Sequence, residues 1–473
     1  MKAFLRSAWN LTSPIFGRGI NFLTLPIVLL IFEEEDFVQI SFNVMLVTGI
    51  SLIASLGSSP KILSLANNGY SELETVTLRI LFKLTLLWST LILSLIVAPT
   101  ESLIALIGVS RNFIVLTIIE GIIIGITQDL LVSSLQGKRD YTFINTLSFI
   151  GIVLLGPMRI MLATIFSVDL DIWISLGIAA RLLVFFAAFF RNSRKANPNQ
   201  NEQIPDQTSK SNVNRIFGAW NFIILVPSLV WIVGNMDRML VPTELSSIDG
   251  AAYQIAYQCA SLLGLLCGQL ILIKTHSILS MEFKILHNAI LELVTLFRLA
   301  LFLSFPFLVL LFEVFHRSIT SQQAAAVVLL AIAQFSWAIA QVNFVHVVTS
   351  KQKTLAPIIC AIFGIGIQLL AIRLNGDANP TLFLSILPSL GFTIIAISLA
   401  IINPIVGKIF ARSFGLTIFV DVFLVMVGIV YVLRNGQDKT LDLFVLLTLL
   451  IIIHVFTNRR NLIGIWRSYE FGR

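Results

Sequence analysis

The sequence has few charged residues. Only 12% of its 473 residues are Asp, Glu, Lys or Arg, whereas soluble domains average about 25%. Hydrophobic residues make up 57% of the chain, and the mean hydropathy is +0.92. Runs of about 20 mostly apolar residues, the length that crosses a bilayer as a helix, fill nearly the whole chain. This composition excludes an ordinary soluble domain and predicts an all-α polytopic membrane protein.

Motifs for nucleotide and metal chemistry are also missing. The sequence has no G-x-x-x-x-G-K-[ST] loop, which excludes ATP binding by a P-loop. Its five histidines are scattered and form no H-E-x-x-H pattern. The three cysteines, Cys259, Cys267 and Cys360, lie in apolar segments and are expected to be packing residues. We therefore expect no metal, no cofactor and no enzymatic activity, and transport would run downhill, couple to an ion or be driven by consumption of its product.

Apolar windows predict about fourteen transmembrane helices. Each window is long enough to cross the bilayer or nearly so, and the eleventh and fourteenth are the shortest. The predicted spans are residues 9–32, 37–57, 78–98, 112–135, 143–166, 172–190, 217–234, 251–273, 290–312, 324–348, 355–372, 382–402, 414–433 and 441–456.

Lysine and arginine set the predicted orientation, because cytoplasmic loops are enriched in them. With the N-terminus inside, most of the 32 Lys and Arg residues fall on the inner side. The net charge of +7 is thus explained by topology, and we expect no nucleic-acid partner. Both termini are predicted to be cytoplasmic. The predicted outer loops carry only Arg111, Arg238, Arg317, Arg373, Arg434 and Lys439.

This topology can be tested by labelling. In a cysteine-free variant, single cysteines at Asn199 and Ser246 are expected to react with membrane-impermeant reagents from opposite sides, because an odd number of predicted spans separates them. Labelling of both positions from outside in intact cells would show that the orientation and the number of spans are wrong.

The chain divides into two parts of similar length. Residues 1–190 are predicted to form an N-terminal six-helix bundle, and residues 191–215, rich in Asn, Gln, Ser and Lys, a cytoplasmic linker. Residues 216–403 form the predicted C-terminal six-helix bundle, followed by two extra helices and a cytoplasmic tail in 404–473. Because six is even, both bundles start inside, which predicts a parallel internal repeat.

Charged residues inside spans are the strongest functional signal. Such a residue at a helix centre is disfavoured by about 2.5–3.5 kcal/mol, so it usually faces the protein interior. Arginines exceed carboxylates there, which predicts a cationic cavity for an anionic ligand, since guanidinium groups match phosphate oxygens. Alternatively, each arginine only pairs with a carboxylate or caps backbone carbonyls. The candidates are Arg18, Arg159, Arg181 and Arg298 for substrate binding, and Glu120 and Asp421 for orienting arginines or binding a coupling cation.

Two adjacent charges, Asp237 and Arg238, follow the apolar run 217–234. Adjacent residues in a helix point about 100° apart, so each should have its own partner. Three interpretations stay open: a solvated helix end, an outer gate, or a carboxylate that faces a cavity. With Asn235, these residues are candidates for a gate or for ion coupling.

The stretch GNMDRMLVPTELSSIDGAAYQIAYQ resembles the passage between helices 7 and 8 of polysaccharide repeat-unit (O-antigen) flippases, which belong to the multidrug/oligosaccharidyl-lipid/polysaccharide (MOP) exporter superfamily. In that family an Asn-x-Asp-Arg ends a span, and a Gly-x-Tyr-x-x-Ala-like segment starts the next. The first hairpin, with Arg18, EEEDF and SLGSSPKIL, is similar too, although Val38 stands where a glycine is usual. The residues of the main stretch that match are Asn235, Asp237, Arg238, Gly250, Tyr253 and Ala256.

This resemblance implies two six-helix bundles that open alternately to the two sides of a bacterial inner membrane. It further implies that the protein flips a polyprenyl-diphosphate-linked oligosaccharide, with membrane lipids, a polysaccharide polymerase and other glycan-assembly proteins as partners. A cation-coupled drug or small-solute antiporter of the same superfamily is the nearest alternative. A membrane glycosyltransferase that uses lipid-phosphate sugars is a further one, because the acidic residues 33–36 and the pair Asp169 and Asp171 resemble its metal-binding acids.

Overall fold

The chain is all-α in the part that the structure, a computed structural model, describes. The described residues are 24, 27–54, 73–97, 110–137, 140–166, 168–193, 225–278, 287–288, 290–292, 295, 321–350, 355–374, 379–404 and 407–409. Within them, eight helices are long and apolar enough to cross a membrane. The prediction of a polytopic helical membrane protein is confirmed.

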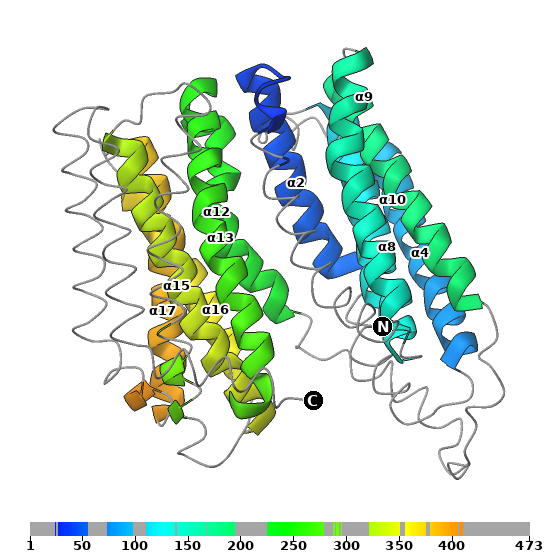
Figure 1. The fold of residues 1–473 in the computed structure, drawn as a ribbon. Helices are drawn as coiled ribbons and strands as arrows, with labels where there is room; N and C mark the ends of the chain where they lie inside the picture. The colour runs from blue at the N-terminus through cyan, green and yellow to red at the C-terminus, as the bar shows by residue number, and fades with distance from the viewer. Residues whose placement is uncertain are drawn as a thin grey trace, which may run out of the picture. The chain divides into compact units, whose positions relative to one another are not determined.

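The chain separates into two compact units, Met1–Ser228 and Leu229–Arg473, each shown in Figure 1. The described helices of unit 1 are α2 (Glu34–Ala54), α4 (Leu73–Val97), α6 (Arg111–Gly125), η1 (Ile126–Val132), α7 (Ser133–Gly137), α8 (Tyr141–Val153), η2 (Leu154–Met158), α9 (Arg159–Phe166) and α10 (Leu170–Ser193). Those of unit 2 are α12 (Leu225–Glu244, from Leu229 on), α13 (Ser247–Ile278), α15 (Ser321–Ser350), α16 (Leu355–Leu374) and α17 (Pro380–Ile402).

Most predicted spans match described helices to within a few residues. The clearest difference is the span predicted at 217–234, because α12 continues to Glu244 and contains Asp237 and Arg238. Hydropathy marks these charges as a helix end, but partners on α13 allow them to stay inside the helix. The spans at 9–32 and 290–312 lie mostly, and those at 414–433 and 441–456 entirely, outside the described residues.

The helix α10 also runs further than predicted. It ends at Ser193, so Arg191, placed at the start of the cytoplasmic linker, belongs to the helix. Its guanidinium pairs with Asp140 at 2.6 Å and lies 5.3 Å from the centre of the Phe143 ring. This ion pair joins the C-terminal end of α10 to the N-terminal end of α8, which holds the last turn of α10 in helical form.

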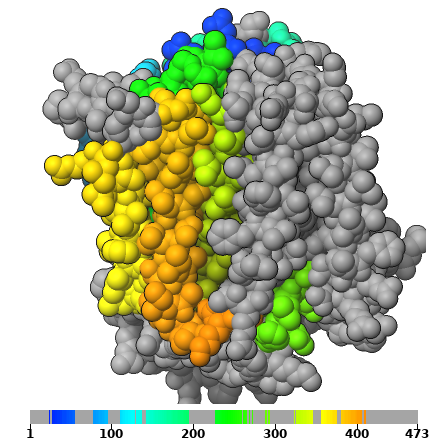
Figure 2. Space-filling model, turned by 90° about the vertical axis from the view of Figure 1, so that its left-hand side faces the viewer, coloured from blue at the N-terminus to red at the C-terminus, as the bar shows by residue number. Residues whose placement is uncertain are grey.

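Exposed apolar side chains cover the outward faces of several helices. Phe82 on α4 is 71% exposed, and Leu374 on α16 is 73% exposed. Figure 2 shows α16 and α17, in yellow and orange, side by side along one face of the molecule. Large apolar surfaces of this kind are stable in contact with lipid acyl chains, which agrees with the membrane assignment.

Both units have the same order of helix packing. In unit 1, α6 packs between α2 and α10, and in unit 2, α15 packs between α13 and α17. In unit 1 these three helices are the second, fourth and sixth predicted spans of the first half of the chain. In unit 2 they are the second, fourth and sixth predicted spans of the second half. In each unit, a central helix therefore carries the residues around which the others pack.

Close helix contacts in both units depend on glycine. At Gly121 of α6, an added Cβ would lie 2.7 Å from Cβ of Ile50 on α2. In unit 2, a Cβ at Gly391 of α17 would lie 2.5 Å from Cγ1 of Val233 and 2.7 Å from Nε2 of Gln368. That Gln368 amide bridges three helices by donating to the carbonyls of Val233 and Leu387, each at 2.8 Å.

Substitution of Gly391 by alanine is expected to destabilise unit 2 by about 1–3 kcal/mol, the usual range for overpacking a core. The new methyl group would displace the Gln368 amide from its two carbonyl acceptors. Thermal unfolding in detergent measures the effect. The matched control is Gly366→Ala on α16, where nothing lies within 4 Å of the added Cβ. An equal melting temperature for both variants would contradict this account of the helix contact.

Candidate functional site

The polar centre of unit 2 lies in the middle of α12. Asp237 is completely buried, and Asn235 and Arg238 are 9% and 7% exposed. The interpretation of Asp237 and Arg238 as a solvated helix end is therefore wrong. All three residues lie inside the packed unit, where each polar group needs a partner.

Asp237 accepts a hydrogen bond from α13. The hydroxyl group of Tyr253, itself fully buried, donates to Oδ2 of Asp237 at 2.5 Å. The other carboxylate oxygen, Oδ1, is buried and has no hydrogen-bond partner. The charge of the neighbouring Arg238 acts on this carboxylate, so Asp237 is a buried acid with a cation nearby and one oxygen that has no hydrogen-bond partner.

Arg238 points to a separate set of partners. Its Nε donates to Oε1 of Gln254 at 3.0 Å, and its Nη1 to Oδ1 of Asn235 at 3.3 Å. The guanidinium carbon lies 4.4 Å from the centre of the Tyr257 ring, a cation–π geometry. Asp237 and Arg238 thus have different partners, as their 100° separation on the helix requires. These partners lie on α12 and α13, within one unit.

The turn of α12 before Asp237 receives additional hydrogen-bond donors. Tyr257 donates to the carbonyl of Gly234 at 3.3 Å, and the Gln368 amide donates to that of Val233. Gln254, Tyr257 and Gln368 are not among the site residues predicted from the sequence. A signal for Tyr257 exists, because the chain has only six tyrosines and Tyr253 and Tyr257 lie one helical turn apart.

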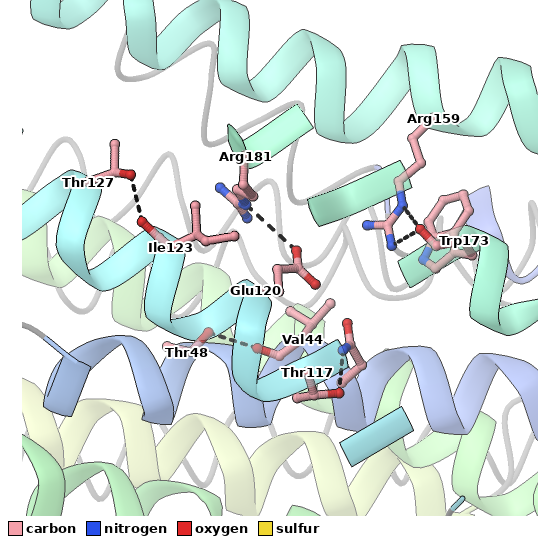
Figure 3. Close-up of polar contacts among 10 residues, drawn as sticks. Val44, Thr48, Thr117, Glu120, Ile123, Thr127, Arg159, Trp173 and Arg181 are labelled. Carbon is pink, nitrogen blue, oxygen red and sulfur yellow. Dashed lines mark hydrogen bonds and ion pairs between the residues drawn. The ribbon is translucent and has the colours of Figure 1, made fainter. Parts of the chain in front are cut away.

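Unit 1 contains a second polar centre, shown in Figure 3. Glu120 on α6 and Arg181 on α10 point toward one another, with Oε1 of Glu120 3.7 Å from Nε of Arg181. The Glu120 side chain is 4% exposed and that of Arg181 is 28% exposed. One turn before Glu120, the hydroxyl of Thr117 accepts a hydrogen bond at 2.8 Å from Asn43 of α2, two residues that the sequence analysis did not identify.

Arg159 is held inside unit 1. Its Nε and Nη2 donate to the carbonyl of Trp173 at 2.8 and 2.5 Å, and its guanidinium carbon lies 4.0 Å from the centre of the Trp173 ring. A Cβ at Gly177 would lie 3.0 Å from the same guanidinium. The structure therefore places Arg159 between Trp173 and Gly177 of α10, as a carbonyl-capping residue that is 6% exposed.

Three of the predicted site residues lie in parts of the chain that the structure does not describe. Arg18, Arg298 and Asp421 lie outside the described residues. Within the part that the structure covers, no group of three or more His, Cys, Asp and Glu side chains could hold a metal ion.

Comparison with known proteins identifies the fold. No known family profile and no curated protein matches the sequence. A solved structure of a multidrug resistance MATE family transporter of the MOP superfamily, in its inward-facing conformation, matches with a TM-score of 0.55 and 14% sequence identity, covering 85% of this chain and 98% of that chain. The described helices have the fold of a MATE transporter.

Two other solved MATE transporters give lower scores. A mutant of the Vibrio cholerae MATE transporter VcmN matches at 13% identity with a TM-score of 0.49, covering 86% of this chain and 95% of that one. A MATE transporter in complex with MaD5 matches at 14% identity with a TM-score of 0.48, covering 85% of this chain and 92% of that one. The first match confirms the expected fold, and membership of the superfamily and of the O-antigen flippase family stays a prediction.

Proposed function

We propose that the protein is a cation-coupled antiporter of small organic solutes that works by alternating access. The observation that supports this proposal is the buried carboxylate of Asp237, with one oxygen bound by Tyr253 and the other without a partner. The fold shared with a multidrug resistance MATE transporter agrees with it.

The ion-binding role of Asp237 follows from its surroundings. Tyr253 donates a neutral hydroxyl group to Asp237, and the Arg238 guanidinium forms its hydrogen bonds and ring contact with Gln254, Asn235 and Tyr257 while its charge also acts on Asp237. A proton or a cation bound at Oδ1 would supply the partner that this carboxylate oxygen lacks. If the two transport conformations bind this ion with different affinities, the ion gradient drives the exchange between them. An ion and a cargo that favour opposite conformations would then be exchanged across the membrane.

The contacts of the arginines in unit 1 support the antiporter over the export of an anionic cargo. The flippase prediction depends on a strongly cationic interior. In the structure, Arg159 is bound to the Trp173 carbonyl and Arg181 is paired with Glu120. Because these groups already have partners, the described part of unit 1 is less cationic than the sequence indicates.

Export of a lipid-linked oligosaccharide is the second candidate. It is favoured by the exposed part of Arg181 and by the similarity of the segment from Asn235 to Arg238 to the exporter motif. In this case the polymerase and other glycan-assembly proteins would be partners. For both candidate functions, we propose that the protein lies in a bacterial inner membrane with both termini in the cytoplasm.

Deletion of the gene separates the two candidates. An antiporter predicts that deleted cells retain a fluorescent organic cation such as ethidium, with normal levels of lipid-linked glycans. A flippase predicts that lipid-linked repeat units accumulate on the inner leaflet while ethidium efflux is unchanged. The second outcome would replace the antiporter proposal by the flippase.

A further inference from the structure

Gln368 is a completely buried amide in the apolar middle of α16. Its Nε2 donates to two backbone carbonyls, that of Val233 on α12 and that of Leu387 on α17. Its Oε1 is buried and has no hydrogen-bond partner. The cost of burying this oxygen offsets part of what the two hydrogen bonds contribute to stability. The places where the amide binds α12 and α17 therefore say more about its role than the hydrogen bonds do by their strength.

The first acceptor belongs to the turn of α12 that leads to Asp237. Val233 lies four residues before Asp237, which is the spacing at which an α-helix pairs a carbonyl with an N–H group. The carbonyl of the next residue, Gly234, accepts a hydrogen bond from Tyr257 of α13 at 3.3 Å. Two donors from other helices, on α13 and α16, thus hold the turn next to the candidate ion site.

The second acceptor lies beside a proline inside α17. Pro388 follows Leu387 and has no N–H group, so the carbonyl of Leu384 lacks its intrahelical donor. Helices bend at such positions. The Gln368 amide approaches this segment closely because Gly391 has no side chain, and an added Cβ there would lie 2.7 Å from Nε2. Gln368 therefore holds α17 at the place where this helix can bend.

A second contact joins Asp237 to the same part of α17. Tyr253, which donates to Oδ2 of Asp237, also forms a hydrogen-bond contact with the side chain of Ser385. Ser385 is completely buried and lies three residues before Pro388. Two routes, one through Tyr253 and one through Gln368, therefore lead from the Asp237 turn of α12 to the residues just before Pro388.

Ion binding at Asp237 would alter these contacts. A hydrogen bond to an ionised group is about twice as strong as one between neutral groups, so the bond from Tyr253 weakens when a proton or a cation neutralises the carboxylate. The contact of α12 with α13 is then looser, and the turn from Val233 to Asp237 can shift. Because Gln368 binds this turn and α17 through the same nitrogen, a shift of α12 moves the amide relative to Leu387.

We propose that Gln368 couples ion binding at Asp237 to a bend of α17 at Pro388. This inference rests on the ion-binding role proposed for Asp237. Gln368 is a positioning residue in this scheme, because it acts through the carbonyls of Val233 and Leu387 and not through the ion. All the groups involved lie in unit 2.

The titratable groups around Asp237 are few. Arg238, Tyr253 and Tyr257 interact with it directly or through one another. The sequence of α17 contains no charged residue. The other charged or titratable residues on α12, α13, α15 and α16 are Glu244, Asp249, Cys259, Cys267, Lys274, His276, His346, Cys360 and Arg373. An ion response that disappears in Asp237→Asn is thereby assigned to Asp237.

The test is a distance measurement by double electron–electron resonance on the purified full-length protein in lipid nanodiscs. In a cysteine-free variant, spin labels are attached at Leu355→Cys on α16 and Ile401→Cys on α17, two exposed positions on helices that lie side by side (Figure 2). Ile401 is roughly 20 Å beyond Pro388 along the helix, so a change of about 10–20° in the bend moves it by roughly 3–7 Å. The distance is measured at alkaline pH without sodium, and again at mildly acidic pH or with sodium added.

A second label pair locates the movement. Leu374→Cys at the end of α16 and Ile386→Cys on α17 are also exposed, and Ile386 precedes Pro388. This pair is expected to keep its distance when the first pair changes, because only the part of α17 after Pro388 swings. An equal shift of both pairs would mean that α17 moves as a rigid body, and would overturn the proposal.

Three variants assign the movement to its cause. Asp237→Asn is expected to remove the ion-dependent shift, and Gln368→Met, which fills a similar volume without donors, to reduce it by at least about half. The matched control is Thr393→Val, which removes a 3.1 Å hydrogen bond between α17 and Ser336 of α15 and leaves both routes from Asp237 in place. This control should keep the full shift. If Gln368→Met does not fold, Gln368→Glu, whose protonated carboxyl group keeps one donor, should show an intermediate shift.

A full shift in Gln368→Met, an equal loss in Thr393→Val, or a distance that does not respond to ions in the unmodified protein would overturn the proposal. Its failure is distinguishable from failure of the proposed function. Ethidium accumulation that requires an ion gradient and Asp237, together with a full shift in Gln368→Met, would reject only the role of Gln368. Absence of both ion-driven accumulation and the shift would reject the proposed function and this inference together.

Discussion

Asp237→Asn is expected to abolish ion-driven transport and leave the protein folded. The amide has almost the same shape as the carboxylate and can still accept a hydrogen bond from Tyr253, so the contact of α12 with α13 survives. Unlike the carboxylate, this amide has no charge that a bound ion could balance. Each 1.4 kcal/mol of lost ion affinity lowers binding about tenfold, and the loss of a full buried charge should exceed this. Cargo movement against its gradient in proteoliposomes measures the effect.

The size of this effect distinguishes an ion site from a gate. If Asp237 only stabilised a closed gate, Asp237→Asn would change transport by about tenfold at most, because the amide keeps the hydrogen bond from Tyr253 and one hydrogen bond contributes only about 0.5–1.5 kcal/mol. The matched control is Asp249→Asn, because Asp249 is an exposed acid in the first turn of α13 that accepts a hydrogen bond from Ser246. This variant should transport normally. A severalfold loss in Asp237→Asn, shared by Asp249→Asn, would contradict an ion-binding role.

Arg159→Ala is expected to cause the largest loss of stability in unit 1. The substitution removes two charged hydrogen bonds to the Trp173 carbonyl and the contact with its ring. Hydrogen bonds of charged groups contribute about 1.5–3 kcal/mol each, and a desolvated cation–π contact contributes about 2 kcal/mol. After the unfavourable burial of the guanidinium is subtracted, we expect a net destabilisation of about 2–4 kcal/mol.

Thermal unfolding in detergent measures this loss, and two further variants define its cause. Arg159→Lys should recover only part of the stability, because an ammonium group cannot direct two N–H groups at the single Trp173 carbonyl oxygen while lying flat against the Trp173 ring, as a planar guanidinium does. Arg373→Ala, at an exposed position in the last turn of α16, should be neutral. An unchanged melting temperature in Arg159→Ala would mean that the residue is free for a ligand, as the sequence-based prediction proposed.

The fold could be predicted largely from the sequence because lipid imposes simple rules on it. Apolar windows located most described helices, since unsatisfied backbone groups do not persist in a bilayer. The same method failed at α12, where Asp237 and Arg238 were read as the end of a span. A hydropathy profile scores each residue by itself. It does not detect that Tyr253 and Gln254 on the next helix form hydrogen bonds with Asp237 and Arg238.

The site was predicted less completely, because its chemistry depends on contacts between distant residues. The sequence identified Glu120, Arg159 and Arg181 as charges inside spans, but only their packing shows that Arg159 caps a carbonyl while Arg181 is loosely paired. A hydropathy profile marks Gln368 as a polar residue in an apolar span but does not show which groups it contacts. Its role appears only when helices far apart in the sequence, here α12, α16 and α17, are brought together.

The most direct test of cation-coupled antiport uses proteoliposomes that contain the purified protein and an imposed proton or sodium gradient. The measured quantity is ethidium accumulation against its own concentration gradient, with and without the ion gradient, in the unmodified protein and in Asp237→Asn. The account predicts accumulation that requires one of the two gradients and that disappears in Asp237→Asn. Accumulation that is independent of both gradients, or that is equal in Asp237→Asn and the unmodified protein, would contradict it.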